Sequence, residues 1–163
     1  MGKNLQESLS HFTDKVSDAI KTRKSILVTT HIDCDGITSG SIISKALIRK
    51  GAKCTVRTTN EFSQNVIEEL KKENSGLYII TDLGGGSAKN LDSVLGDNWI
   101  VLDHHQIPDE EIDNQNVINA WKFGIDGGTE ICAGGMTYLA STALNKDNKD
   151  LSAMAVVSAL GDR

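Results

Sequence analysis

Aspartate and histidine side chains recur in this sequence in short groups that could bind metal ions. The first group is His31-Ile32-Asp33-Cys34-Asp35-Gly36, the second is Thr81-Asp82, and the third is Asp103-His104-His105. Carboxylate oxygens with an imidazole nitrogen favour Mg²⁺ or Mn²⁺, whereas a thiolate-dominated zinc site needs paired cysteines, which this chain lacks. The residue types therefore indicate oxygen-rich divalent-metal chemistry.

Each group also has an ordinary structural explanation when it is taken alone. Asp-x-Asp-Gly is often a solvated turn, and Asp82 at a strand end could cap the next helix. The first group is not an EF-hand loop, because aligning Asp33 and Asp35 with its third and fifth positions places His31 and Ile42 where carboxylates are required. Adjacent histidines after an apolar strand serve no packing purpose, so the three groups together favour a functional site.

The segments that carry these groups have the pattern of alternating strands and helices. Apolar spacing predicts helices over residues 4–23, 37–50, 63–73, 87–95, 136–144 and 151–160, and short apolar runs predict strands over 25–31, 53–58, 77–81, 99–102 and 117–120. This alternation predicts an α/β fold with a mostly parallel sheet and helices on both faces, a Rossmann-like architecture. Because the carboxyl ends of parallel strands meet at one crevice, we expect the three groups to be neighbours.

Glycine-rich segments lie near these groups. Gly84-Gly85-Gly86 does not fit the GxGxxG dinucleotide pattern, because Lys89 stands at its last position, and we interpret it as backbone that passes close to the metal pocket. Gly127-Gly128 and Gly134-Gly135 precede a predicted helix whose N-terminal amides could hold a phosphate, although turn formation is the commoner role. Gly134 and Gly135 are therefore candidate substrate-binding residues.

The composition is that of a folded, water-exposed domain. The chain has 163 residues, of which 39% are hydrophobic and 24% are charged, with a single proline. This length predicts one domain, and the composition excludes a disordered or collagen-like chain. Because no apolar run could cross a membrane and the N-terminus lacks the apolar core of a signal peptide, we expect a cytoplasmic protein without a membrane partner. The three cysteines are expected to be reduced thiols.

The net charge of −5 is unevenly distributed. Residues 1–72 carry 12 Lys and Arg against 8 Asp and Glu, while residues 73–163 carry 5 against 14. This pattern excludes a generic basic nucleic-acid-binding surface, and an acidic surface repels phosphates unless bound metal ions supply positive charge. A basic cluster is most often a solvated face, with contact to a nucleic-acid backbone as the alternative. Its members are Lys45, Arg49, Lys50, Lys53 and Arg57.

Four segments together resemble the motifs of a known family. In chain order, His-Ile-Asp-Cys-Asp-Gly, Thr-Asp-Leu-Gly, Leu-Asp-His-His-Gln and Ala-Leu-Gly-Asp-Arg are similar to the four motifs of the DHH phosphoesterase superfamily. The match runs from His31 to Arg163, and within the superfamily it most resembles archaeal RecJ-like single-strand exonucleases. Other members are oligoribonucleases, cyclic-dinucleotide phosphodiesterases, family II inorganic pyrophosphatases and exopolyphosphatases.

The resemblance implies a site for two divalent metal ions, with Mn²⁺ favoured and Mg²⁺ as the alternative. By position, the residues that match the family's metal ligands are Asp33, Asp35, Asp82, His104 and Asp162. Asp82 would bridge the two ions. His105 matches the histidine that faces the substrate phosphate and Asp103 would orient an imidazole, which makes these two the candidate catalytic residues. His31 is either a ligand or a substrate contact, because its spacing from Asp33 differs from that of the ligand histidine in relatives.

The resemblance also implies an activity, hydrolysis of single-stranded nucleic acid or short oligonucleotides. One alternative is a DHH enzyme for a small phosphate, such as a dinucleotide, pyrophosphate or polyphosphate. Another is a replisome scaffold that binds GINS-type partners without catalysis, although the retained metal ligands favour an enzyme. The family's smaller C-terminal substrate-binding domain has no counterpart in this sequence, so we expect the N-terminal part of a longer protein and weak activity of this chain by itself.

Overall fold

A five-stranded sheet forms the centre of the computed structural model, which describes residues 4–108, 110 and 113–162. All neighbouring strands are parallel, in the order β2-β1-β3-β4-β5. The strands are β1 Ser25–His31, β2 Lys53–Thr59, β3 Leu77–Thr81, β4 Trp99–Asp103 and β5 Val117–Asn119.

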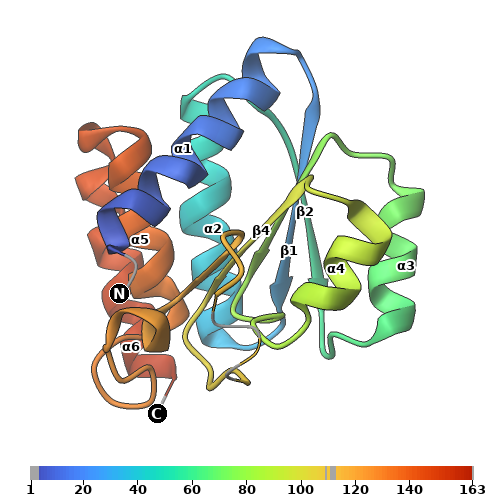
Figure 1. The fold of residues 1–163 in the computed structure, drawn as a ribbon. Coiled ribbons are helices and arrows are strands. Elements are labelled where there is room, and N and C mark those ends of the chain that lie inside the picture. Colours follow the sequence, from blue (N-terminus) through green and yellow to red (C-terminus); the bar gives the residue numbers. More distant parts are fainter. Residues whose placement is uncertain (1–3, 109, 111–112, 163) are drawn as a thin grey trace.

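Helices cover both faces of this sheet. The α-helices are α1 Leu5–Lys21, α2 Cys34–Arg49, α3 Gln64–Lys72, α4 Ala88–Leu95, α5 Ala133–Leu144 and α6 Ser152–Gly161, and two 3₁₀ helices are η2 Ala120–Phe123 and η3 Lys146–Leu151. Figure 1 shows α1, α2, α5 and α6 on one side of the sheet and α3 and α4 on the other. The predicted α/β class with a parallel sheet and helices on both faces is confirmed.

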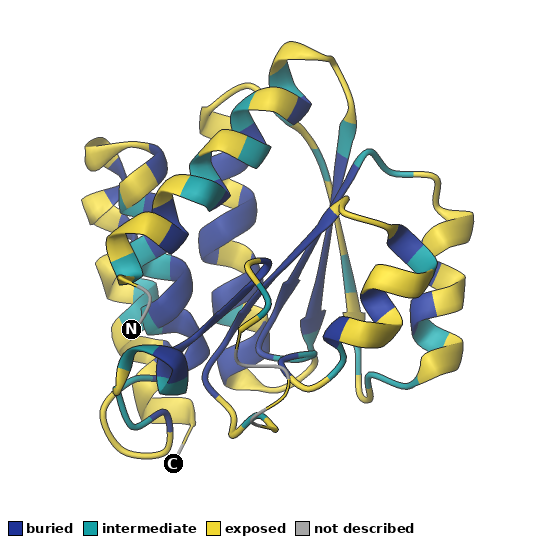
Figure 2. Ribbon diagram, in the orientation of Figure 1, coloured by how far each residue is buried: buried dark blue, intermediate teal, exposed yellow. Residues whose placement is uncertain are grey.

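The sheet separates two apolar cores. Phe12, Ile43 and Met136 are fully buried between the sheet and the helices α1, α2 and α5. On the opposite face Ile67 and Trp99 are fully buried beneath α3 and α4. Strands β3 and β4 are buried along their whole length, as Figure 2 shows, which explains why they read as continuous apolar runs rather than alternating ones.

Two helices begin earlier than the apolar spacing predicts. Helix α2 starts at Cys34 rather than at residue 37, because the side chain of Asp33 accepts a hydrogen bond from the Gly36 amide at 2.8 Å. Helix α5 starts at Ala133 rather than at residue 136, because the carboxylate of Asp35 accepts from the first amides of that helix. Carboxylates satisfy the free amides of a helix N-terminus and favour its dipole. Polar caps therefore extend both helices beyond their apolar stripes.

The almost wholly apolar segment 151–160 packs on one side only. It forms helix α6, in which Ser158 is fully buried and Met154 packs against the core. Val156, Val157 and Leu160 are each more than half exposed. Within the described residues, α6 included, no helix has the length and apolar character that crossing a membrane requires.

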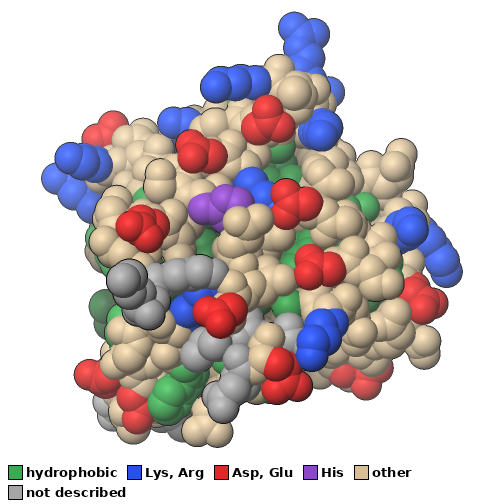
Figure 3. Space-filling model, viewed as in Figure 1, with side chains coloured by type: hydrophobic (Ala, Val, Ile, Leu, Met, Phe, Trp, Pro, Cys, Tyr) green, Lys and Arg blue, Asp and Glu red, His purple; other side chains and the backbone are tan. Residues whose placement is uncertain are grey.

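The two arginines of the basic cluster form ion pairs within the domain. Arg49 forms two hydrogen bonds of 2.7 Å with Asp150, and Arg57 lies 2.6 Å from Glu69. On the described part of the face seen in Figure 3, acidic and basic side chains are interspersed. These ion pairs favour the structural interpretation of the cluster over a nucleic-acid contact.

Candidate metal centre

Three neighbouring strands place one polar residue each at the same level of the sheet. Thr81 of β3 pairs with the penultimate residue of β1 and with the penultimate residue of β4. The residues that follow these three are His31, Asp82 and Asp103. The strand order reverses between β1 and β3, which is where open parallel sheets bind ligands at their carboxyl edge.

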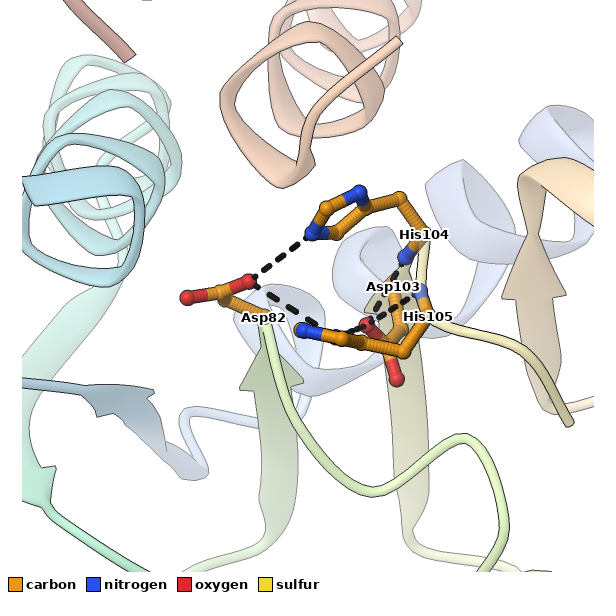
Figure 4. Close-up of side chains that lie close together, drawn as sticks. All are labelled: Asp82, Asp103, His104 and His105. Carbon is orange, nitrogen blue, oxygen red and sulfur yellow. Dashed lines mark hydrogen bonds and ion pairs between the residues drawn. The ribbon is translucent and has the colours of Figure 1, made fainter. Parts of the chain in front are cut away.

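Ligand atoms from four segments of the chain gather at this edge. The ligand atoms form three overlapping groups, and within each group they all lie within 4.8 Å of one another. The groups are His31, Asp33 and Asp82; Asp35, His104 and Asp162; and Asp82, Asp103, His104 and His105. Figure 4 shows how the last group converges from the ends of β3 and β4. Every residue that the sequence analysis assigned to a metal thus belongs to one group or more, and Asp82 and His104 each belong to two.

Asp82 lies at the middle of the site. Its backbone has φ 62°, a left-handed conformation that non-glycine residues adopt rarely and often at functional sites. The carboxylate is 1% exposed, with Oδ1 3.3 Å from His104 Nε2 and Oδ2 3.7 Å from His31 Nδ1. Burial raises the pKa of Asp82 to about 6, against the lowering effect of His104. Asp82 therefore faces His31 and His104 at once.

Two buried polar atoms of the site have no hydrogen-bond partner among the described residues. They are Asp82 Oδ2 and His104 Nε2. The nearest carboxylate oxygens to His104 Nε2 belong to Asp82 and Asp35, at 3.3 and 3.4 Å. Buried polar atoms without partners are costly, and clustered carboxylates repel one another unless a cation lies between them. The donor set and its unpartnered atoms therefore fit a divalent cation.

His104 is held in one orientation by groups outside the motifs. Its Nδ1 lies 2.7 Å from the carbonyl of Gly127, and Trp121 Nε1 donates to the His104 carbonyl at 2.8 Å. An N–H on Nδ1 that donates to Gly127 leaves Nε2 as the atom facing the carboxylates. A Cβ on Gly127 would overlap the His104 carbonyl, so this close approach requires glycine. Burial alone would lower the pKa of His104, but Asp82 and the Gly127 carbonyl raise it to about 9.

Asp103 orients the second imidazole and the loop around it. Asp103 Oδ1 accepts from the His104 amide at 2.7 Å and lies 2.8 Å from His105 Nδ1, while Oδ2 accepts from the Gly85 amide at 3.0 Å. Burial opposes ionisation of Asp103, but the hydrogen bonds from His105 and the amides lower its pKa. The same hydrogen bond raises the pKa of His105, which is otherwise mostly exposed. The contact of Gly85 agrees with the interpretation that the glycine run passes close to the site.

Asp35 connects the site to helix α5. Its Oδ2 accepts from the Ala133 amide and its Oδ1 from the Gly134 amide, both at 2.8 Å, and Ser158 Oγ also donates to Oδ1. The Gly134 amide, a candidate for substrate binding, thus serves Asp35 in this structure, and a Cβ on Gly135 would meet the side chain of Ile131.

Asp33 and Asp162 belong to two different ligand groups of the site. Asp33 Oδ2 lies 2.7 Å from His31 Nδ1, and its Oδ1 caps α2. Burial would raise the pKa of Asp33, but hydrogen bonds from Gly36 and His31 lower it. Asp162 follows α6, with Oδ2 3.9 Å from His104 Nδ1, and burial raises its pKa. His31 therefore lies near the carboxylates of Asp33 and Asp82, and its role as a ligand or a substrate contact stays a prediction.

Sequence reasoning missed the residues that hold these ligands in place. Ser158 precedes Asp162 by one helical turn, a spacing that was available as a signal once α6 was predicted. Trp121 carries no such signal, because it reaches His104 from the 3₁₀ helix η2 that follows β5. Gly127 was considered only as a turn or a phosphate contact, whereas its carbonyl orients His104.

Comparisons with known proteins agree with this geometry. The model of the DHH family, N-terminal domain, matches residues 25–161. An uncharacterized protein from Methanocaldococcus jannaschii is 37% identical, over 91% of this chain and 36% of its own length. The chain thus spans about a third of the length of that relative.

Solved structures share the fold. RecJ from Thermus thermophilus in complex with Mn²⁺ has a TM-score of 0.78 at 22% identity, covering 95% of this chain and 24% of that one. Exonuclease RecJ bound to manganese has a TM-score of 0.79 at 22% identity, covering 99% and 44%. CDC45 from Entamoeba histolytica has a TM-score of 0.63 at 17% identity, covering 96% and 32%. Because the family model covers most of the chain and the fold matches RecJ, this protein belongs to the DHH family and contains its RecJ-like N-terminal domain.

Proposed function

We propose that this domain hydrolyses phosphodiester bonds with the help of two divalent cations, Mn²⁺ in preference to Mg²⁺. The observation that carries the proposal is the gathering of six acidic and imidazole ligands around Asp82 Oδ2 and His104 Nε2, two buried atoms without hydrogen-bond partners among the described residues. One ion would be held by His31, Asp33 and Asp82, and the other by a second set of ligands. That second set is Asp82, Asp35, His104 and Asp162. RecJ structures of the same fold were solved with Mn²⁺ and with Mg²⁺.

The cations would bring chemistry that the side chains lack. When bound, they would stabilise negative charge on the phosphate and lower the pKa of the attacking water. The residues around them have separate tasks. Asp103 holds the His105 ring through Nδ1, which leaves Nε2 directed away from that contact. Because the hydrogen bond raises the pKa of His105, a larger share of this exposed imidazole is protonated at neutral pH and can donate to a phosphate oxygen.

We propose single-stranded nucleic acid or a short oligonucleotide as the substrate. The support is the shared fold with exonuclease RecJ and the presence of all four motifs in one chain. The alternative is a scaffold, to which the likeness to CDC45 points. A scaffold that binds GINS-type partners has no need of metal ligands, so the grouping of the candidate ligands at one edge of the sheet supports an enzyme. Because the chain covers about a third of its relative, activity and partners of the whole protein are part of this proposal.

The test is Mn²⁺-dependent hydrolysis of end-labelled single-stranded DNA and RNA, with pyrophosphate as a third substrate. We expect nucleotide release from an oligonucleotide, and we expect Asp82→Asn to abolish it. The matched control is Asp147→Asn, because Asp147 is exposed and follows the far end of α5, about 17 Å from the end that contacts Asp35. Release that persists in Asp82→Asn, or that needs no divalent cation, would exclude this site.

Metal binding provides a second readout that does not depend on turnover. Asp82→Ala should weaken Mn²⁺ binding in calorimetry more than Asp33→Ala does, because Asp82 faces both groups of ligands. Equal losses in the two variants would show that Asp82 does not serve both ions. A chain that binds Mn²⁺ but hydrolyses none of the three substrates would favour the scaffold.

A further inference from the structure

A pocket of about 330 Å³ opens directly beside the metal centre. Its volume is at the lower end of the range for small-molecule sites, about 300–1,000 Å³. His104 and His105 line it on the side of the metal centre, and Gln106, Trp121 and Asp126 line the rest together with glycine backbone. The surface of the pocket is largely apolar. A phosphate at the metal centre has no apolar group that could occupy this pocket, so the pocket points to a second part of the ligand.

Trp121 is the aromatic wall of this pocket, and hydrogen bonds hold both its backbone and its indole ring. Its backbone amide donates to Asn119 Oδ1 at 3.0 Å, and its Nε1 donates to the His104 carbonyl at 2.8 Å. The only polar atom of the ring is therefore already bonded, and the ring is half-buried rather than enclosed. A rigid aromatic ring loses little conformational freedom when a planar ligand stacks on it. The geometry of Trp121 thus suits a stacking surface.

We propose that this pocket holds the nucleobase of the nucleotide whose phosphate occupies the metal centre, with the base stacked on Trp121. The proposal rests on the proposed phosphodiesterase function and adds to it a subsite for the base. His104 and His105 belong both to the metal centre and to the pocket, so the two subsites are adjacent, as the phosphate and base of one nucleotide are. Pyrophosphate and polyphosphate contain no apolar or planar group that would fill it. Stacking also tolerates any base, which suits a nuclease without sequence preference.

The experiment compares two ligands that differ only in the base. The chain is titrated in the presence of Mn²⁺ with adenosine 5′-monophosphate and with ribose 5-phosphate, and tryptophan fluorescence is excited at the red edge of the tryptophan band, where adenine absorbs little. Trp99 is fully buried, so a nucleotide in the pocket can contact only Trp121. The Trp99→Phe variant, in which Trp121 is the only tryptophan, reports on stacking directly.

We expect adenosine 5′-monophosphate to quench Trp121 and to bind about 5- to 140-fold more tightly than ribose 5-phosphate, the range that corresponds to stacking one base. Trp121→Ala should remove this ratio, whatever the loss of its hydrogen bond to the His104 carbonyl does to the phosphate contact that both ligands share. Trp121→Phe should keep most of the ratio, because the aromatic face is retained while the hydrogen bond to His104 is lost.

Two results would overturn the inference. One is equal affinity for the two ligands in the unmodified chain, which includes the case in which neither binds. The other is a Trp121→Ala variant that weakens both ligands by the same factor, since Trp121 would then act only through the carbonyl of His104. The affinity ratio cancels such an indirect effect, because both ligands carry the same phosphate. If the base stacks but no oligonucleotide is hydrolysed, the inference stands and the proposed catalysis fails.

Discussion

In the metal-free domain, the free energy of unfolding should decrease as the pH rises from 6.5 to 9. In the metal-free protein His104 lies between the carboxylates of Asp82 and Asp35, and its pKa is raised from 6.5 to about 9. A raised pKa means that the folded state holds this proton more tightly than the unfolded chain does. The resulting stabilisation is therefore complete below pH 6.5 and is lost as the pH rises through 9. At about 1.4 kcal/mol for each pH unit, the loss amounts to about 3 kcal/mol.

In the presence of Mn²⁺, the stability of the domain should instead increase as the pH rises. An imidazole must lose its proton to become a ligand, so metal binding competes with protonation of His104. The affinity for Mn²⁺ should then rise about tenfold for each pH unit up to about 9, with about one proton released per binding event at neutral pH. Below about pH 6 the proton on Asp82 must also leave, and the dependence should become steeper.

The assay is urea denaturation of the chelator-treated and Mn²⁺-saturated chain at several pH values, with calorimetry in two buffers of different ionisation enthalpy to count protons. His104→Gln should flatten the metal-free stability profile and abolish most of the proton release, while the separate titration of His105 is retained. If metal-free stability rose between pH 6.5 and 9, or if no proton were released on binding, His104 would not be a protonated group that the metal displaces.

Two further predictions concern the groups that position the ligands. Asp103→Asn should keep the fold but weaken Mn²⁺ binding in calorimetry by about 10- to 100-fold, since Asp103 orients the loop that carries His104; unchanged affinity would contradict that role. Gly134→Ala should destabilise the domain in urea denaturation by about 1–3 kcal/mol, because the added Cβ would overlap Ser158 Oγ. Gly128→Ala is its control, because the nearest atom there is 3.3 Å away in a side chain, and equal losses in the two variants would refute the packing argument.

The sequence was sufficient to predict the sheet and the convergence of the motifs. Buried parallel strands produce unbroken apolar runs, and the polar residue that ends each run marks the carboxyl edge of the sheet. Because Asp82 and Asp103 each follow or end such a run, their meeting depends only on the strands being parallel and adjacent. These features are local in the sequence and follow from one topological rule.

The parts that could not be predicted depend on contacts between distant segments. The start of helix α5 is set by Asp35, which lies 98 residues before Ala133 in the chain. Trp121 reaches His104 from a 3₁₀ turn, and a lone tryptophan after a short strand gives no indication of its partner. The tautomer of His104 is likewise set by the carbonyl of Gly127, a group that every residue has. Sequence patterns therefore identify the candidate functional side chains more readily than the distant groups that position those side chains.

Two carboxylates of the candidate metal centre also hold the fold together. Asp33 caps α2 and Asp35 caps α5, so the amides at two helix ends stabilise negative charge at the site before any cation binds. Substituting either residue removes a cap as well as a proposed ligand, and a loss of about 1 kcal/mol of stability would accompany any loss of activity. Asp82 caps no helix, and its Oδ2 is unpartnered among the described residues. Replacing Asp82 therefore removes no helix cap, although it removes the 3.3 Å contact with His104 that raises the pKa of that imidazole, whereas replacing Asp33 or Asp35 removes a cap directly.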